Sequence, residues 1–265
     1  MTAIIVAKRR RAGSVSVVAD AAQYQAAHGI ISFADKVYSI PHWPGAIAAA
    51  GVSCLHAMIV WSLAQDFATF DDAVAGMAEA LPRAISLWQK PTEIVAGYRL
   101  PTTMLVIFAG FSSARGQPEA YVARTDDTIP PGETREEAEG SKYWGERPFA
   151  LTPLGDVTMT PVPHDLIVPA RFEGVDLDGT EDEFTWSMRK VLQMQRHMLL
   201  PPEIGGIGGF ATLTTVSADG ISQRVIERWP EDKIGPKLEV GTIDWDRWHR
   251  ENPKPYVVKQ LRLRR

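Results

Sequence analysis

The first fifty residues alternate short β-branched and apolar runs with turns, a pattern that predicts β-strands. Residues 2–8 and 14–19 form two such runs on either side of a basic turn at 9–13, so we expect a hairpin. Two further short strands are expected at 36–40 and 46–50, separated by prolines. The chain therefore begins with antiparallel sheet.

After residue 50 the apolar positions change to a helical period. They indicate one helix around residues 55–67 and a second over 70–88, with Asp71 near its start, where the helix dipole favours an acidic side chain. Pro82 is expected to interrupt the second helix or to kink it. Strands then resume at 104–110 and 119–124.

The second half is punctuated by glycine and proline. We expect a surface loop over 126–140 and short extended pieces over 148–178. A helix is expected over 181–199, with Thr180 as its N-cap and Glu183 completing a capping box. A final hairpin is expected from strands at 210–216 and 221–226.

The helices in this order are grouped rather than alternating with single strands, which favours an α+β layered fold over a parallel βαβ sheet. We expect one main domain over 1–241, with an insertion at about 126–178, and an aromatic and basic C-terminal tail over 242–265. No internal repeat divides the chain.

Composition narrows the class of protein. The chain has 45% hydrophobic and 23% charged residues and a net charge of −4, which gives no overall field for nucleic acid or an anionic membrane. No apolar run reaches the roughly 18–20 residues of a membrane span, and the N-terminus is the reverse of a secretory signal. The single cysteine, Cys54, suits a reducing compartment. We expect a cytoplasmic protein.

Metal and cofactor sites are not expected. The six histidines show no ligand spacing, so the sequence predicts no metal site. The glycine-rich stretch at 205–209 is followed by a hairpin and by no lysine, so it predicts a turn rather than a phosphate-binding loop. We therefore expect no cofactor.

The candidate chemistry begins at Thr2, because removal of Met1 would leave a free α-amine on a residue with a hydroxyl. An α-amine has a pKa of about 7.7–8.0 and can act as the base for its own hydroxyl. A nearby cation lowers that pKa further, and a buried lysine needs a carboxylate to stay charged. Lys36 and Asp20, at the ends of the early strands, are candidates for these two roles, and Gly51 for an oxyanion donor.

These features together resemble proteasome β-subunits and the peptidase of the bacterial ATP-dependent two-component protease. The similarity covers about residues 2–90 and resumes at 207–226. It implies a four-layer αββα sandwich of two antiparallel sheets, the N-terminal-nucleophile (Ntn) hydrolase fold, and amide hydrolysis through a threonyl ester. By resemblance, Thr2 is the nucleophile, Lys36 the cation and Asp20 its partner.

The same resemblance implies that Ala50 and Gly51 contact the substrate backbone. It also implies that copies of the chain assemble with one another, and a ring-like assembly is possible because members of the family form rings. Two isoleucines, Ile204 and Ile207, stand where the family carries an aspartate and a serine that support the N-terminal amine. Three readings stay open: a peptidase, an inactive structural or assembly protein of a phage-like particle or larger complex, and a small-molecule amidase. A peptide or amide substrate is expected, and no ATPase partner is identified.

Overall fold

The computed structural model describes residues 2–25, 29–51, 53–97, 104–125, 149–162, 174–198, 206–235, 237–238 and 240–255. Within these residues it contains two five-stranded sheets, a two-stranded sheet and four helices, and every strand pair is antiparallel. The predicted α+β class is confirmed.

The first large sheet is built from the N-terminal hairpin and the last hairpin of the chain. Strand β2 lies at its centre and pairs with β1 on one side and β11 on the other, so that Asp20, at the end of β2, lies opposite Ala211. The strand order is β10 (Val157–Thr160), β1 (Ile4–Arg9), β2 (Ser14–Asp20), β11 (Phe210–Ser217) and β12 (Gly220–Arg228).

The second large sheet is formed mainly by the middle of the chain, and its strands are joined by α1 and α2 between β6 and β7. The strand order is β5 (Val37–Ile40), β6 (Gly45–Ala50), β7 (Leu105–Ser112), β8 (Gln117–Arg124) and β9 (Thr152–Pro153). A separate hairpin, β3 (Ala22–Gln25) and β4 (Gly29–Phe33), connects the two large sheets along the chain.

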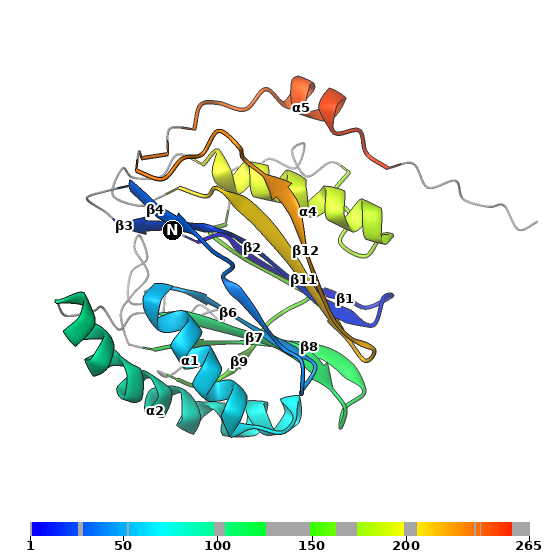
Figure 1. The fold of residues 1–265 in the computed structure, drawn as a ribbon. Helices are drawn as coiled ribbons and strands as arrows, with labels where there is room; N and C mark the ends of the chain where they lie inside the picture. Colours follow the sequence, from blue (N-terminus) through cyan, green and yellow to red (C-terminus); the bar gives the residue numbers. More distant parts are fainter. Residues whose placement is uncertain are drawn as a thin grey trace, which may run out of the picture.

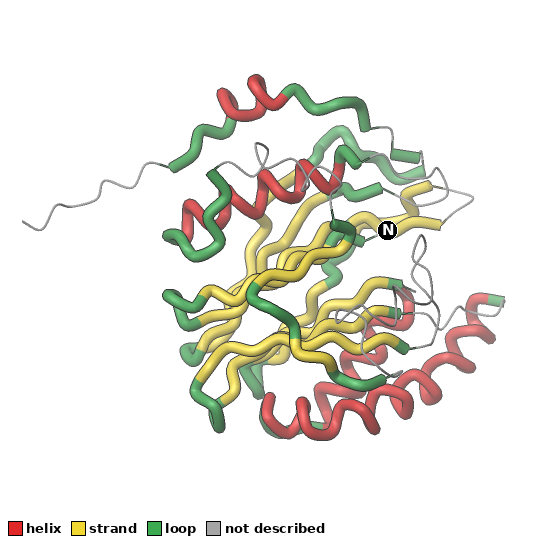
Figure 2. Tube along the Cα trace, turned by 180° about the vertical axis from the view of Figure 1, so that it is seen from behind, coloured by secondary structure: helices red, strands yellow, loops and turns green. Residues whose placement is uncertain are grey.

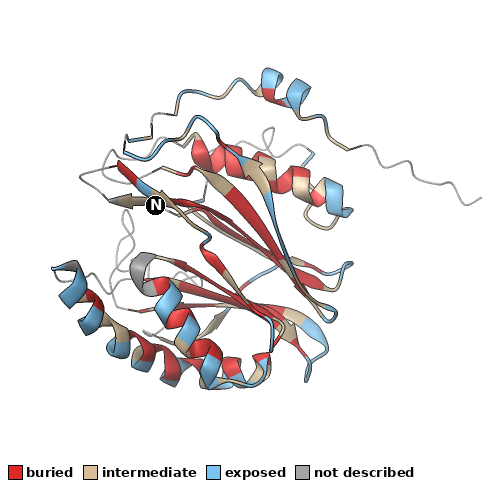
Figure 3. Ribbon diagram, viewed as in Figure 1, coloured by how far each residue is buried: buried red, intermediate tan, exposed pale blue. Residues whose placement is uncertain are grey.

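The two large sheets face each other across a shared apolar core, to which Val17 of β2 and Ile107 of β7 both belong. Helix α4 (Glu181–Arg196) packs on the outer face of the first sheet, and α1 (Ser53–Asp66) and α2 (Phe70–Ala96) pack on the outer face of the second. Figures 1 and 2 show this order of layers from the front and from behind, and Figure 3 shows the buried residues concentrated between the layers.

Helix α2 differs from its prediction. It runs from Phe70 to Ala96 and continues through both Pro82 and Pro91, so the expected interruption at Pro82 is wrong. A proline inside a helix costs roughly 3 kcal/mol. Buried neighbours such as Met77 and Leu81 pack into the core beneath the second sheet, and this packing holds the helix together across the proline.

The region expected to be an insertion, 126–178, contributes to both sheets. Strand β9 pairs with β8 and strand β10 pairs with β1, so both lie at sheet edges. The loop expected over 126–140 lies outside the described residues. The β3–β4 hairpin was not predicted.

The helix predicted from residue 181 is confirmed, and so is its capping box. The Thr180 side chain accepts from the Glu183 backbone N–H, and the Glu183 carboxylate accepts from the Thr180 N–H at 2.9 Å. The last described helix, α5 (Trp245–Glu251), lies against α4 (Figure 1), where Trp186 Nε1 donates to the Asn252 carbonyl at 2.8 Å. The basic end of the tail, 256–265, lies outside the described residues.

None of the helices in the described part of the chain combines the length and the apolar character needed to cross a bilayer.

Candidate active site

The Asp20 carboxylate is the buried centre of the site. Its position at the end of β2 places it where the first sheet meets the β3–β4 hairpin, and its side chain is fully enclosed. Oδ1 accepts from Lys36 Nζ at 2.8 Å and from the Ala3 N–H at 2.9 Å. Oδ2 accepts from the Ala22 N–H at 3.2 Å and from the Gly208 N–H at 3.3 Å. Three segments distant in sequence, at Ala3, Lys36 and Gly208, are thereby bonded to one carboxylate.

Lys36 comes directly before β5, and its side chain is almost as enclosed as that of Asp20. An isolated ammonium in such a place would lose its proton or destabilise the fold, because removing a charge from water costs several kcal/mol. Asp20 supplies the partner at 2.8 Å, so Lys36 is buried as a member of an ion pair beside the start of the chain.

Thr2, Lys36, Ala50 and Gly51 line one cavity of about 270 Å³. The structure thus brings together the residues singled out from the sequence, with Asp20 behind Lys36. Ala22, Gln23, Tyr24, His56 and Thr160 complete the lining.

The backbone next to Thr2 is fixed from two directions. The Ala3 N–H donates to the Asp20 side chain at 2.9 Å, and the Ala3 carbonyl accepts from the Asp20 N–H at 3.3 Å. These bonds set the position of Thr2 at the cavity wall. Met1 lies outside the described residues.

Gly51 joins β6 to α1 with a φ of +134°, a backbone conformation that residues with a Cβ rarely adopt. The turn lets the chain pass from the strand into the helix at the cavity. Ala50 and Gly51 therefore line the same cavity as Thr2.

His56 is a site residue that the sequence did not reveal. It lies in α1, five residues after Gly51, and only 4% of its surface is exposed. Burial, and then the charge of Lys36, lower the pKa of His56 to about 4, so the imidazole is neutral at pH 7. In the sequence it is one of six histidines without ligand spacing, and its burial in the folded chain sets it apart.

Tyr24 comes from the unpredicted β3–β4 hairpin. Burial raises the pKa of its hydroxyl, and the negative charges of Asp20 and Asp232 raise it further. The Tyr24 hydroxyl is therefore protonated at neutral pH, and it lies beside Gly206.

The turn at Gly208 and Gly209 supports the site from behind. The Gly208 carbonyl accepts from the N–H groups of Ala21 and Ala22, while its own N–H donates to Asp20. The Gly209 N–H donates to Asp232 Oδ2 at 2.6 Å. The turn is thus bonded to the active-site carboxylate on one side and to a second carboxylate on the other.

Asp232 is itself paired with Arg196 of α4, at 2.7 and 2.8 Å, and both side chains are enclosed. Arg196 also donates to the Ile207 carbonyl at 2.7 Å. The Ile207 side chain lies in the apolar core with α4, and Ile204 lies outside the described residues. A charged pair therefore holds the turn that follows Ile207.

No group of three or more histidine, cysteine, aspartate or glutamate side chains that could hold a metal ion occurs among the described residues.

No protein-family model and no curated protein matches the chain. The chemistry of the site follows from the residues and geometry described above.

Proposed function

We propose that the protein is an Ntn-type amide hydrolase, a threonine peptidase in which Thr2, after removal of Met1, supplies both nucleophile and base. The observation that carries the proposal is the convergence of Thr2, Lys36 and the Gly51 turn on one cavity, with Asp20 bonded both to Lys36 and to the Ala3 N–H. The layer order of helices, two facing sheets and a helix supports the αββα sandwich of this class.

In the reaction, the Thr2 amine accepts the hydroxyl proton as Oγ1 bonds to the substrate carbonyl carbon and the carbonyl π pair moves to oxygen. The intermediate then collapses, the C–N bond breaks, and the leaving nitrogen takes the proton from the Thr2 ammonium. Water, deprotonated by the same amine, attacks the resulting ester and releases the acid and free Thr2.

Lys36 and Asp20 make the amine a usable base. The Lys36 charge disfavours the ammonium form of Thr2 and so increases the fraction of free amine at neutral pH. Asp20 keeps Lys36 charged and also orients the peptide that follows Thr2. The Asp20 side chain therefore affects both the pKa of the Thr2 amine, through Lys36, and the position of that amine.

The Gly51 backbone N–H is our candidate for the oxyanion donor. It lies in the turn that lines the cavity, and a main-chain donor there needs no reorganisation as charge develops. Loss of one such donor typically reduces kcat by about 100- to 1,000-fold.

The test is intact mass after treatment with a peptidyl β-lactone. Attack by Oγ1 opens the lactone without expelling an atom, so the mass rises by that of the whole reagent. We expect a protein lacking Met1 that takes one lactone, and no adduct in Thr2→Ala. Thr2→Ser, which keeps amine and hydroxyl, should retain the adduct. A chain that keeps Met1 and takes no lactone would contradict the proposal.

That negative outcome would favour the second candidate, an inactive assembly protein of the same fold. The buried Ile207 supports this alternative, because an apolar side chain there gives no hydrogen bond to a free N-terminal amine. For either candidate we also propose a cytoplasmic location and self-assembly.

A further inference from the structure

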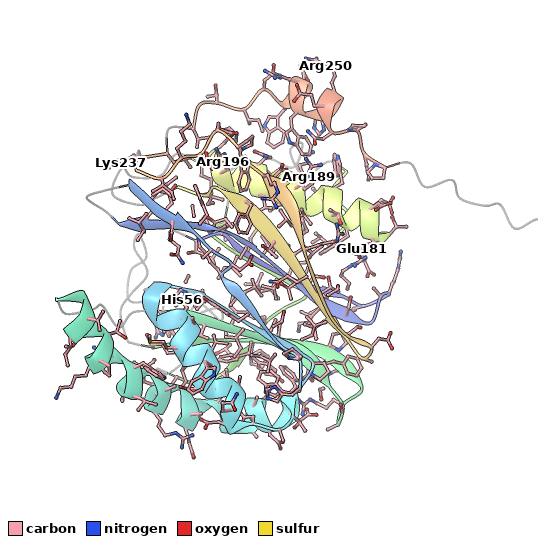
Figure 4. The ribbon with its side chains drawn as sticks, viewed as in Figure 1. His56, Glu181, Arg189, Arg196, Lys237 and Arg250 are labelled. Atoms are coloured by element: carbon pink, nitrogen blue, oxygen red, sulfur yellow. The ribbon has the colours of Figure 1, made fainter. Side chains whose placement is uncertain are left out.

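His56 is a buried titratable side chain that the proposed reaction does not use. Its Nε2 atom is enclosed and has no hydrogen-bond partner among the described residues. Figure 4 shows His56 in the first turns of α1, and the side chain lines the same cavity as Thr2 and Lys36. Buried polar atoms are nearly always bonded, so a ligand is a natural partner for this nitrogen.

The polar groups around His56 are rich in donors. Lys36, which lines the cavity with His56, has three N–H groups, and one of them donates to Asp20. Both oxygens of Asp20 already accept hydrogen bonds. No aspartate or glutamate is among the described residues that line the cavity. A ligand group with negative oxygen acceptors complements this lining.

The size of the cavity limits what it holds. At about 270 Å³ it is slightly smaller than the roughly 300–1,000 Å³ of sites for drug-sized ligands. It suits one substrate side chain next to the reacting carbonyl rather than a whole peptide.

We propose that this cavity binds the carboxylate of an acidic substrate residue, glutamate or aspartate, on the acyl side of the cleaved amide, and that His56 donates to it from Nε2–H. The inference rests on the proposed function for the position of that amide, because Thr2 lines the same cavity. His56 is thus a specificity residue, and it takes no part in the bond-breaking steps.

The first experiment compares two fluorogenic peptides that differ only in glutamate or glutamine on the acyl side. We expect kcat/KM to be about 10-fold or more higher for glutamate, as for hydrogen bonds to charged groups. His56→Leu should bring the ratio close to one while hydrolysis of the glutamine peptide persists. His56→Gln, which restores an N–H donor, should recover part of the preference. His42→Leu, a histidine outside the cavity lining, is the matched control.

The second experiment does not depend on catalysis. Thr2→Ala protein is titrated with N-acetyl-glutamic acid α-amide, whose single carboxylate is the side chain, and with N-acetyl-glutamine amide. We expect the acid to bind more tightly, and its binding to be about 10-fold weaker when His56→Leu is added. If Thr2→Ala protein binds the acid but wild-type protein hydrolyses neither peptide, the hydrolase proposal is wrong and the inference about acid binding is still supported. Equal binding of the two amides, no binding of the acid, or acid binding unaffected by His56→Leu would overturn the inference.

Discussion

At the scale of single residues, the Asp20 carboxylate has two roles. It balances the charge of Lys36, and it accepts three backbone N–H groups, from Ala3, Ala22 and Gly208. A carboxylate bonded in this way is stable in a buried place because each lone pair has a donor. The charge state of the proposed base and the position of the N-terminal strand therefore depend on the same side chain.

The buried His56 side chain should make the free energy of unfolding depend on pH. Its pKa is about 4 in the folded protein and about 6.5 in an unfolded chain, so between these values the unfolded state binds a proton that the folded state does not. Stability should therefore fall as the pH drops through this window, by about 2 kcal/mol from His56 alone at about pH 5.

The measurement is urea unfolding of wild type and His56→Leu at about pH 7.5 and about pH 5. The variant lacks this titration, so wild type should lose about 2 kcal/mol more than the variant on acidification. The same loss in both proteins would show that His56 is not held neutral by burial and Lys36.

The proximity of Thr2, Asp20 and Lys36 could be predicted from the sequence because all three lie where the early strands begin or end, which the alternation of residues predicts. The place of His56 and Tyr24 at the same cavity could not be predicted in this way. It depends on the packing of α1 and of a hairpin without an apolar period.

At the scale of elements, the turn at Gly208 and Gly209 needs both its glycines and its charged support. Gly209 has a φ of +78°, and a Cβ there would lie 2.3 Å from the Phe33 ring. A Cβ on Gly208 would lie 2.4 Å from the Asp232 carboxylate. The segment after β12 therefore takes part in the site by fitting closely around this turn.

Asp232→Asn tests this support. The change leaves the buried Arg196 without its charged partner, and removal of one member of a buried pair costs about 3–5 kcal/mol. Chemical denaturation should show this loss, and proposed Thr2 activity should fall because the turn also holds Asp20. Glu231→Gln is the matched control, because Glu231 contacts the same Arg196 but is 64% exposed and should contribute about 1 kcal/mol or less. Equal effects of the two variants would contradict the prediction.

Most long elements could be predicted because their periods are clear, as for β2 and α4. Strands β9 and β10 lie where short extended pieces are expected, but they have only two and four residues, and their pairing with β8 and β1 could not be predicted from so little pattern. At Pro82, the low helix propensity of proline opposes the packing of α2 on the second sheet, and the helix continues through the proline.

At the scale of the whole molecule, the two outer faces are covered differently. On the first sheet, α4 is overlaid by the C-terminal segment, where Trp186, Trp248 and His249 pack together. On the second sheet, α1 and α2 have no described segment outside them (Figures 1 and 3). Five large apolar side chains are exposed on this helix pair: Met58, Trp61, Leu87, Ile94 and Val95.

We predict that a second copy of the chain covers this α1–α2 face. Trp61 and Trp88 pack edge to face across the two helices, and exposed apolar groups of this kind mark protein interfaces. Trp61→Gln combined with Leu87→Gln should reduce the mass found by sedimentation from a multiple of the chain mass to a single chain, with an unchanged circular dichroism spectrum. Ile234→Gln is the control, because Ile234 is 63% exposed, close to the 61% of Trp61, but lies after β12. An assembly that survives the double substitution, or a wild-type protein that sediments as one chain, would contradict the prediction, since burying the exposed Trp61 is its driving force.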